Sequence, residues 1–197
     1  MISPQFRSLL KDVHQCDVCA EFLPLGPNPV LQAHPAARIL IAGQAPGKKV
    51  HLSGVPFDDA SGDRLRDWMG IDREVFYDEK MLAILPMGFC YPGTGKSGDL
   101  PPRPECAPKW RARILSQLAH VELTLVIGQY ALAYHFPDKY SSLTEAVQDW
   151  PNRAKDIMVL PHPSPRNNLW VKRNPWFETE LIPVLQQRIT RILQANI

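Results

Sequence analysis

The stretch RILIAGQAPG, residues 38–47, decides the fold of this chain. A run of apolar residues that ends in glycine and leads into a proline-containing loop indicates a buried strand followed by a turn. The stretch LTLVIGQYALAYHF, residues 123–136, repeats the order of strand, glycine and helix. A strand that passes through a glycine turn into a helix is typical of the crossover units of parallel sheets, so both stretches predict an α/β fold.

The rest of the chain continues this alternation. Two further strands are expected within MLAILPMGF, residues 81–89, and DIMVLPHPS, residues 156–164. Ser61 is the expected N-cap of one helix, and Gly70 its expected end. Helices are expected over residues 3–14, 61–70 and 107–120, and from Asn174 to the C-terminal region. The pattern predicts a three-layer αβα sandwich with a central four-stranded parallel sheet, in a single domain over residues 1–197.

Composition narrows the class of protein. The 197 residues are 45% apolar and 21% charged, which is ordinary for a globular protein, but the 20 prolines are about twice the usual share of roughly 5%. The chain start lacks an export signal, and apolar runs are shorter than the ~20 residues that cross a bilayer. We therefore expect a cytoplasmic monomer without membrane association. A formal net charge of +2 does not by itself indicate a nucleic-acid partner.

The four cysteines form a pattern that favours a metal centre. Cys16 and Cys19 form a CxxC, while Cys90 and Cys106 bracket the polar segment YPGTGKSGDLPPRPE. Disulfides are disfavoured in a protein without an export signal, because the cytosol keeps thiols reduced. Four thiolates suit either a structural zinc ion or an iron–sulfur cluster. Free buried thiols are the alternative, and spacing alone does not choose between the two metals.

The loops that follow the expected strands carry the most unusual sequence. Ligands of parallel α/β folds bind at the carboxyl ends of the strands, where these loops meet. The loop after the first strand begins GQAPG, and LPHPSPRNN, residues 160–168, includes the end of the fourth strand and packs three prolines, a histidine and an arginine into nine positions. Glycine and proline let backbone approach a ligand closely and fix its donors, although a tight turn would use the same residues.

Taken together, these motifs resemble those of a known family. GQAPG stands at residues 43–47, GVPF at 54–57, ASG at 60–62 and HPSPRN at 162–167. In this order and spacing they are similar to the motifs of the uracil-DNA glycosylase superfamily, most closely those of its iron–sulfur branch, often called family 4. That branch also has a CxxC before the first strand and two cysteines around a proline-rich loop after the second. HPSPRN in particular resembles the version in the single-strand-selective glycosylases.

The resemblance implies an enzyme of base-excision repair. Such a glycosylase hydrolyses the N-glycosidic bond of uracil, or of another deaminated or damaged base, in DNA after the base has been flipped out of the stack. Gln44 and His162 are the implied catalytic residues. The implied base-binding residues are Gly43, Ala45, Pro46, Gly47, Phe57, Met87 and Gly88. The implied DNA contacts are Ser164, Arg166 and Asn167. The implied cofactor is a [4Fe–4S] cluster on Cys16, Cys19, Cys90 and Cys106, with structural zinc as the alternative.

Two departures from the family pattern leave other functions open. Gln44 stands where the family commonly has a water-activating carboxylate, and Pro86 stands where it has an asparagine that reads uracil. Backbone groups of Met87 or Gly88 could replace the asparagine. One alternative is therefore a catalytically weak or inactive member that binds damaged or single-stranded DNA. Another is an unrelated nucleotide or phosphate-ester hydrolase, for which the glycine loop alone would suffice.

Overall fold

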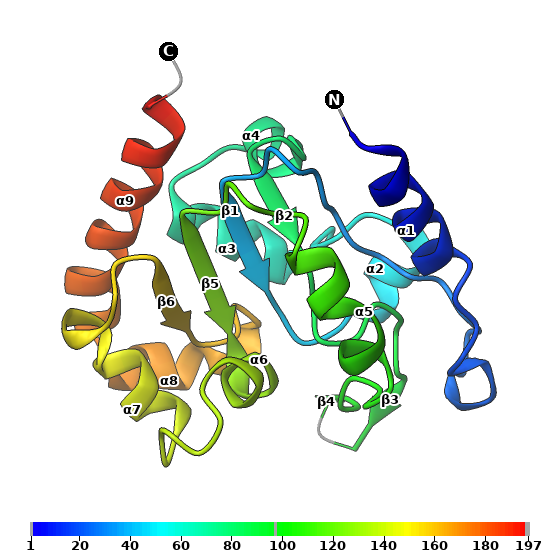
Figure 1. The fold of residues 1–197 in the computed structure, drawn as a ribbon. Helices are drawn as coiled ribbons and strands as arrows, with labels where there is room; N and C mark the ends of the chain where they lie inside the picture. Colours follow the sequence, from blue (N-terminus) through cyan, green and yellow to red (C-terminus); the bar gives the residue numbers. More distant parts are fainter. Residues whose placement is uncertain (1, 97, 196–197) are drawn as a thin grey trace.

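A four-stranded parallel sheet forms the centre of the computed structural model, which describes residues 2–96 and 98–195. The strands are β1 (Ile39–Ala42), β2 (Leu82–Ile84), β5 (Leu123–Ile127) and β6 (Ile157–Leu160). Their order is β2-β1-β5-β6, so the first strand of the chain lies inside the sheet. Ile41 of β1 pairs with Ile84 on one side and with Leu125 on the other. The arrows in Figure 1 point toward the edge where β3, β4 and α8 lie, which is therefore the carboxyl edge.

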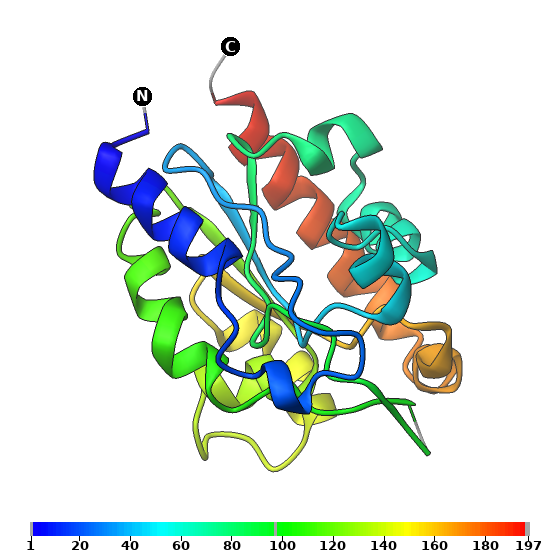
Figure 2. The same cartoon turned by 90° about the vertical axis from the view of Figure 1, so that its right-hand side faces the viewer.

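Helices cover both faces of the sheet. Figure 2 shows α1 (Pro4–His14) and α5 (Cys106–Leu115) on one side, and α3 (Ala60–Met69) and α9 (Ile182–Gln194) on the other. Two further helices, α6 (Gly128–His135) and α7 (Leu143–Gln148), contact β5 and β6, respectively. The predicted αβα arrangement around a four-stranded parallel sheet is confirmed.

Alternation of side chains along the strands explains the two layers. Ile39 and Ile41 belong to the core that α3 and α9 complete, whereas Leu40 between them belongs to a second core with Phe6 of α1 and Trp110 of α5. Successive side chains of a strand point to opposite faces, so an apolar run without interruption requires cover on both sides. The continuous apolar sequence of β1 thus accounts for the three-layer architecture.

The helix boundaries at α3 correct one expectation. Asp59, not Ser61, is the N-cap, because Asp59 Oδ1 accepts a hydrogen bond from the Gly62 N–H at 2.9 Å. The helix ends at Gly70 as predicted, where φ is +66°. Ser61 therefore lies inside the first turn of the helix.

Three other expected elements have different bounds. The strand expected over residues 81–89 is confined to β2, and the helix expected over 107–120 ends at Leu115. Pro86 lacks an N–H group and therefore cannot donate to a strand ladder. The helix expected from Asn174 begins with a π-helical turn, Phe177–Leu181, before α9. Among the helices of the described residues, none combines the length and the apolar character that a membrane span needs.

Several short elements were not expected from the sequence. They are the helices α2 (Lys48–Ser53), α4 (Arg73–Tyr77) and α8 (Asn168–Arg173), and the hairpin of β3 (Thr94–Gly95) and β4 (Gly98–Asp99). The helix α7 was likewise missed. Each of these helices has six residues or fewer, too few for a helical period to stand out.

Candidate active site

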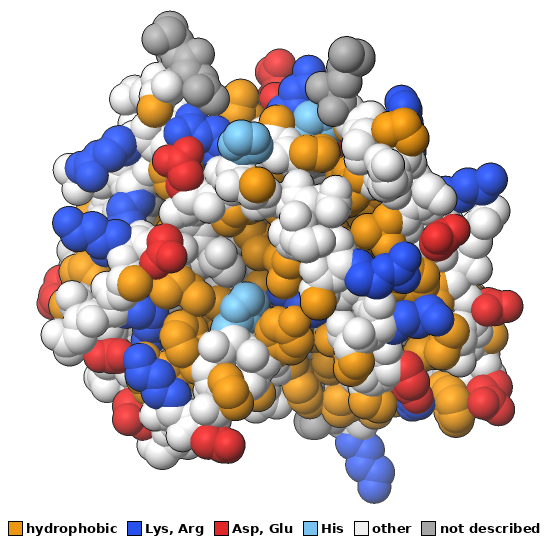
Figure 3. Space-filling model, in the orientation of Figure 1, with side chains coloured by type: hydrophobic (Ala, Val, Ile, Leu, Met, Phe, Trp, Pro, Cys, Tyr) orange, Lys and Arg blue, Asp and Glu red, His pale blue; other side chains and the backbone are white. Residues whose placement is uncertain are grey.

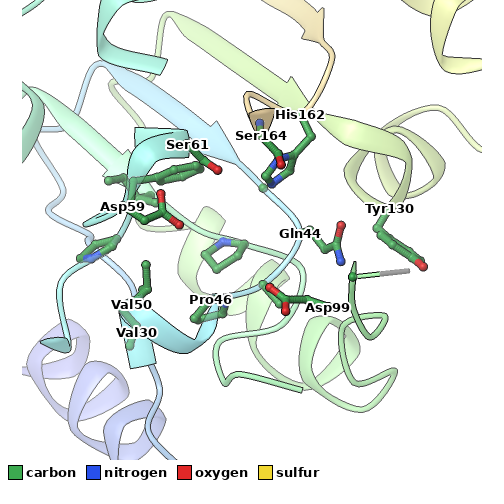
Figure 4. Close-up of a pocket in the computed structure, with 18 of the residues that line it drawn as sticks. Val30, Gln44, Pro46, Val50, Asp59, Ser61, Asp99, Tyr130, His162 and Ser164 are labelled. Carbon is green, nitrogen blue, oxygen red and sulfur yellow. Dashed lines mark hydrogen bonds between the residues drawn. The ribbon is translucent and has the colours of Figure 1, made fainter. Parts of the chain in front are cut away.

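A cavity of about 540 Å³ lies at the carboxyl edge of the sheet. The loops after β1 and β6 form two of its walls, and the β3–β4 hairpin contributes a third (Figure 4). The sequence-predicted residues that line it are Gly43, Gln44, Ala45, Pro46, Gly47, Phe57, His162, Ser164, Arg166 and Asn167. Segments more than one hundred residues apart in the sequence are thus brought together as the motifs predict.

His162 has a defined tautomer in this cavity. Its Nδ1 accepts a hydrogen bond from the Ser164 N–H at 3.2 Å, so the proton of the neutral ring is on Nε2. Burial lowers the pKa of His162, and the charge of Arg166 acts in the same direction, while Asp59 and Asp99 oppose the shift. The side chain extends from the end of β6 toward the loop after β1 (Figure 4). The site therefore holds a neutral imidazole that can donate a hydrogen bond through Nε2.

The loop that carries His162 is held by its own polar side chains. Asn167 Nδ2 donates to the His162 carbonyl at 2.7 Å, and Ser164 Oγ accepts from the Arg166 N–H at 3.3 Å. These bonds close a short 3₁₀ turn, Pro165–Asn167, whose proline also restricts the backbone. Asn167, expected as a DNA contact, thus has an amide group that already orients the histidine loop. Ser164 keeps its hydroxyl proton for a further acceptor.

Phe57 has a strained backbone conformation. Its φ is +54°, which is rare for a bulky residue and costs of order 1–3 kcal/mol. A β-carbon at Gly62 would lie 1.8 Å from the Phe57 carbonyl oxygen, and one at Gly43 would lie 3.6 Å from the ring. The ring also makes an edge contact with Phe76, with centroids 6.1 Å apart. Gly62 therefore allows this conformation, whereas a side chain at Gly43 would make only an ordinary contact with the ring, and the strain lies at the cavity wall.

Gln44 is oriented by the hairpin region. Its Nε2 donates to the Leu100 carbonyl at 3.3 Å, so the amide nitrogen is directed to the backbone that follows β4. The side chain is half-buried in the cavity wall. Because the nitrogen is engaged, Oε1 is the end of the amide that can accept a hydrogen bond from a ligand or a water molecule.

Met87 and Gly88 are not part of the cavity lining, although Pro86 is. The Met87 N–H donates to the Gly43 carbonyl at 2.9 Å, and the Gly88 N–H donates to the Gln44 carbonyl at 3.0 Å. The backbone donors proposed to replace the family's asparagine are therefore already engaged. This geometry does not support a base-reading role for the N–H groups of Met87 and Gly88.

The cavity also contains side chains that sequence reasoning missed. Asp59, Ser61, Asp99 and Tyr130 all line it (Figure 4). Asp59 could have been found from its place just before a helix start, where aspartate is a frequent cap. Asp99 carried no such signal, because the hairpin that presents it has strands of two residues each.

The β3–β4 hairpin meets the histidine loop across the cavity. Gly98 has φ of +137°, and a β-carbon there would lie 1.8 Å from Nη1 of Arg166. Only glycine accommodates both the backbone angle and this close approach. The segment between Cys90 and Cys106 therefore forms a wall of the cavity and contacts Arg166.

The four cysteines line a second cavity, away from the first. They are free thiols, and the lining around them includes Val13, Phe89 and Trp110. The space left between the side chains is about 20 Å³. Within residues 2–96 and 98–195, no three His, Cys, Asp or Glu side chains are arranged to hold a single metal ion.

The surroundings of these sulfur atoms are specific. Trp110 Nε1 donates to Cys16 Sγ at 3.4 Å, and the Phe89 N–H donates to Cys106 Sγ at 3.3 Å. Burial raises the pKa of Cys90 to about 11 and that of Cys106 to about 12. These two thiols are therefore protonated at neutral pH, and binding to a metal would release their protons. N–H donors aimed at sulfur suit the thiolates of such a centre.

A parallel sheet covered on both faces, with a neutral histidine, an aromatic ring and a glycine–proline loop at its carboxyl edge, defines an α/β protein with a ligand site at that edge. Residues 32–186 match the family model described as the uracil DNA glycosylase superfamily. This match covers most of the chain, and the protein belongs to that superfamily. Cys16 and Cys19 precede the matched region.

Proposed function

We propose that this protein is a DNA glycosylase that hydrolyses the N-glycosidic bond of uracil, or of another deaminated or damaged base, after the base has been flipped from DNA. The observation that carries the proposal is the neutral His162, with Nδ1 engaged and Nε2 free to donate, beside Phe57 in one cavity. DNA glycosylase activity is the chemistry that superfamily membership suggests. The flipped base would occupy this cavity.

His162 has the catalytic role in this mechanism. As the bond between C1′ and the base nitrogen breaks, the electron pair leaves with the base, and negative charge grows on its oxygen atoms. A preorganised neutral donor stabilises that charge without losing a proton, and such donors typically contribute ~10² to 10³ in rate. The Ser164 N–H keeps the required tautomer. Phe57 would stack on the ring of the base, a contact that does not depend on hydrogen bonds.

The histidine loop would also keep the base out of the stack. Extrusion costs a few kcal/mol, and a backbone stiffened by prolines loses little further entropy when it docks against DNA. Arg166 lies at the rim of the cavity, where it could fill the space that the base vacates. Ser164 could donate to a phosphate. On the face in Figure 3, the Lys and Arg side chains of the described residues are mixed with acidic and apolar ones and form no broad basic patch.

The residue at position 86 affects which base the protein can recognise. Pro86 has no side-chain hydrogen bond to offer, and the neighbouring N–H groups are engaged within the fold. An unpaired polar edge of uracil would cost about 1 to 3 kcal/mol. The side chains of Ser61 and Tyr130 could supply replacement contacts, since both line the cavity. A deaminated purine or an oxidised pyrimidine is therefore tested alongside uracil.

A cleavage assay tests the proposed function. Oligonucleotides with uracil, hypoxanthine, xanthine or 5-hydroxymethyluracil, as single strands and as duplexes, are incubated with the protein and then treated with alkali to break abasic sites. Strand breaks at one of these bases, and none in undamaged DNA, are expected. Retention of damaged DNA without cleavage would contradict the enzyme and favour a binding protein, for which Gln44 and Pro86 are the specific evidence. Hydrolysis of free nucleotides alone would point to a phosphate-ester hydrolase.

We also propose that Cys16, Cys19, Cys90 and Cys106 hold a [4Fe–4S] cluster, as in the iron–sulfur branch of the superfamily. All four sulfur atoms surround one cavity, and two of them accept N–H hydrogen bonds. When bound, the group would supply covalent anchoring and no step of the hydrolysis.

Metal analysis tests this assignment. Anaerobically purified protein should be brown and contain about four iron and four sulfide per chain. Stoichiometric zinc without sulfide, in protein produced with iron available, would contradict the cluster and favour the structural zinc site. Protein without either metal would contradict both.

A further inference from the structure

Asp99 places a carboxylate near Gln44, which stands where the family commonly has a carboxylate. It is the last residue of β4, and its side chain lies below Gln44 in Figure 4. Gln44 Nε2 donates to the carbonyl of the next residue, Leu100, which ties the amide to this part of the hairpin. On the other side is the glycine–proline loop: a β-carbon at Gly47 would lie 3.4 Å from Asp99 Oδ2. The carboxylate therefore lies between the hairpin and the GQAPG loop, inside the cavity lining.

A chain of two hydrogen bonds orients this carboxylate. Thr94 of β3 and Asp99 of β4 are cross-strand partners, and Thr94 Oγ1 donates to Asp99 Oδ1 at 3.1 Å. Tyr91 Oη lies 2.6 Å from Thr94 Oγ1. Threonine has one hydroxyl proton and gives it to Asp99, so Tyr91 is the donor in the second bond. Tyr91 is buried, whereas Thr94 and Asp99 are exposed, so this chain holds Oδ1 on the hairpin and leaves Oδ2 for the cavity.

We propose that Asp99 is a catalytic residue that supplies the carboxylate missing at position 44. This inference rests on the proposed function. A water molecule would donate one hydrogen bond to Gln44 Oε1 and one to Asp99 Oδ2. The oxygen of this water forms the bond to C1′ while the bond from C1′ to the base nitrogen breaks and its electron pair leaves with the base. The water's proton passes to Asp99 and then to the departing base. The negative carboxylate also stabilises the positive charge that develops on the sugar.

Asp59 also lines the cavity, so its carboxylate is the one to compare with that of Asp99. Its Oδ2 would lie 3.9 Å from the same β-carbon position at Gly47, but its Oδ1 caps α3 through the Gly62 N–H at 2.9 Å. The cap gives Asp59 a structural role that Asp99 does not share. Asparagine is as good a cap as aspartate, so Asp59→Asn removes the charge and keeps the helix start.

Single-turnover cleavage of the base that wild-type protein excises tests the assignment. Asp99→Asn should lower the rate by ~10² to 10⁴, the range of general-base catalysis. Asp59→Asn should lose much less, and Gln44→Glu added to Asp99→Asn should restore at least part of the rate. A near wild-type rate for Asp99→Asn, or a larger loss for Asp59→Asn, would overturn the role of Asp99. Absence of wild-type cleavage on every DNA base would instead overturn the proposed function itself.

Binding provides a readout that does not depend on turnover. DNA with a pyrrolidine abasic analogue carries a cation that mimics the sugar in the transition state, whereas a tetrahydrofuran analogue is neutral. Asp99→Asn should weaken binding of the pyrrolidine DNA at least tenfold more than binding of the tetrahydrofuran DNA. Equal losses on the two analogues would show that Asp99 contributes only to general DNA affinity, and would contradict the proposal.

Discussion

The cavity at the carboxyl edge of the sheet and the cavity around the cysteines differ in how they are built. The one at the carboxyl edge is large and is formed by loops that directly follow strands, with its key side chains held by hydrogen bonds to nearby backbone, as His162 is by the Ser164 N–H. The one around the cysteines has almost no empty space, an apolar lining, and thiols whose pKa burial raises, to about 12 at Cys106. The first suits a ligand that enters and leaves. In the proposal above, the second holds a bound group permanently.

The segment from residue 91 to 105 connects the two cavities. It starts and ends next to cysteines, and its hairpin reaches the first cavity, where Gly98 contacts Arg166 and Asp99 joins the lining. Tyr91, adjacent to Cys90, begins the hydrogen bonds that orient Asp99. Changes in the first cavity should therefore affect chemistry in an intact fold, whereas changes at the cysteines should loosen the hairpin and act on the site indirectly.

Cys90→Ala should have the largest effect and separates the two cavities most sharply. Loss of one thiolate should remove all bound iron and sulfide, because a cluster needs its full set of cysteines. The freed segment 91–105 should then become sensitive to proteases, as judged by limited digestion and mass spectrometry. Ser116→Ala, an exposed change just after α5, is the control. An unchanged digestion pattern after loss of the metal would show that the cysteines do not anchor the hairpin.

Gly62→Ala should have the next largest effect. It tests whether the cavity at the carboxyl edge depends on packing around Phe57. The added carbon would lie 1.8 Å from the Phe57 carbonyl oxygen, so backbone must move, at a cost of about 3 kcal/mol in the free energy of unfolding. Gly54→Ala is the matched control: φ there is +70° and nothing lies within 4 Å, so it should cost about 1 kcal/mol. Urea unfolding measures both values. Equal losses would mean that Phe57 is not held by this contact.

Arg166→Ala should have a smaller effect that depends on the substrate. If Arg166 stabilises the extruded base, its loss should slow cleavage about tenfold more in duplex DNA than in single strands, where unstacking costs little. Lys172→Ala, an exposed cation on α8, is the control and should not distinguish the two substrates. Equal losses on both substrates, with a weaker salt dependence of binding, would identify Arg166 as a phosphate contact instead.

The smallest effect concerns pH. Burial lowers the pKa of His162, so the ring should stay neutral as the pH falls through the usual histidine range near 6.5. Single-turnover cleavage should therefore be retained in that range and decline only as the pH falls through the lowered pKa, where protonation takes Nδ1 from the Ser164 N–H. A rate that rises on protonation of a histidine would contradict the neutral donor.

The sheet and the motifs that follow its strands could be predicted from the sequence for physical reasons. The apolar runs of β1 and β5 are buried on both faces, and a glycine follows each strand, so the strands stand out without any knowledge of their neighbours. The motif at residues 162–167 follows β6 directly, and parallel strands bring such loops to one edge. These features are local in the sequence, and local signals can be read from one chain.

What was missed depends on contacts that leave no periodic signal in the sequence. The orientation of Asp99 comes from a hairpin whose strands have two residues each and from Tyr91, and neither carries a periodic signal. The engagement of the Met87 and Gly88 N–H groups follows from how the chain after β2 runs beside the chain after β1. Asp59 and not Ser61 is the helix cap, because Asp59 Oδ1 accepts the hydrogen bond from the Gly62 N–H.

The most direct test of the account is single-turnover cleavage by His162→Ala, measured together with its affinity for the same damaged DNA. His162 is assigned to charge that exists only in the transition state, so its loss should lower the rate by ~10² to 10³ and leave affinity nearly unchanged. His162→Asn, which keeps a neutral donor on a shorter side chain, should retain more activity than alanine. A His162→Ala protein that cleaves at the wild-type rate would contradict the assignment of this cavity as the catalytic site.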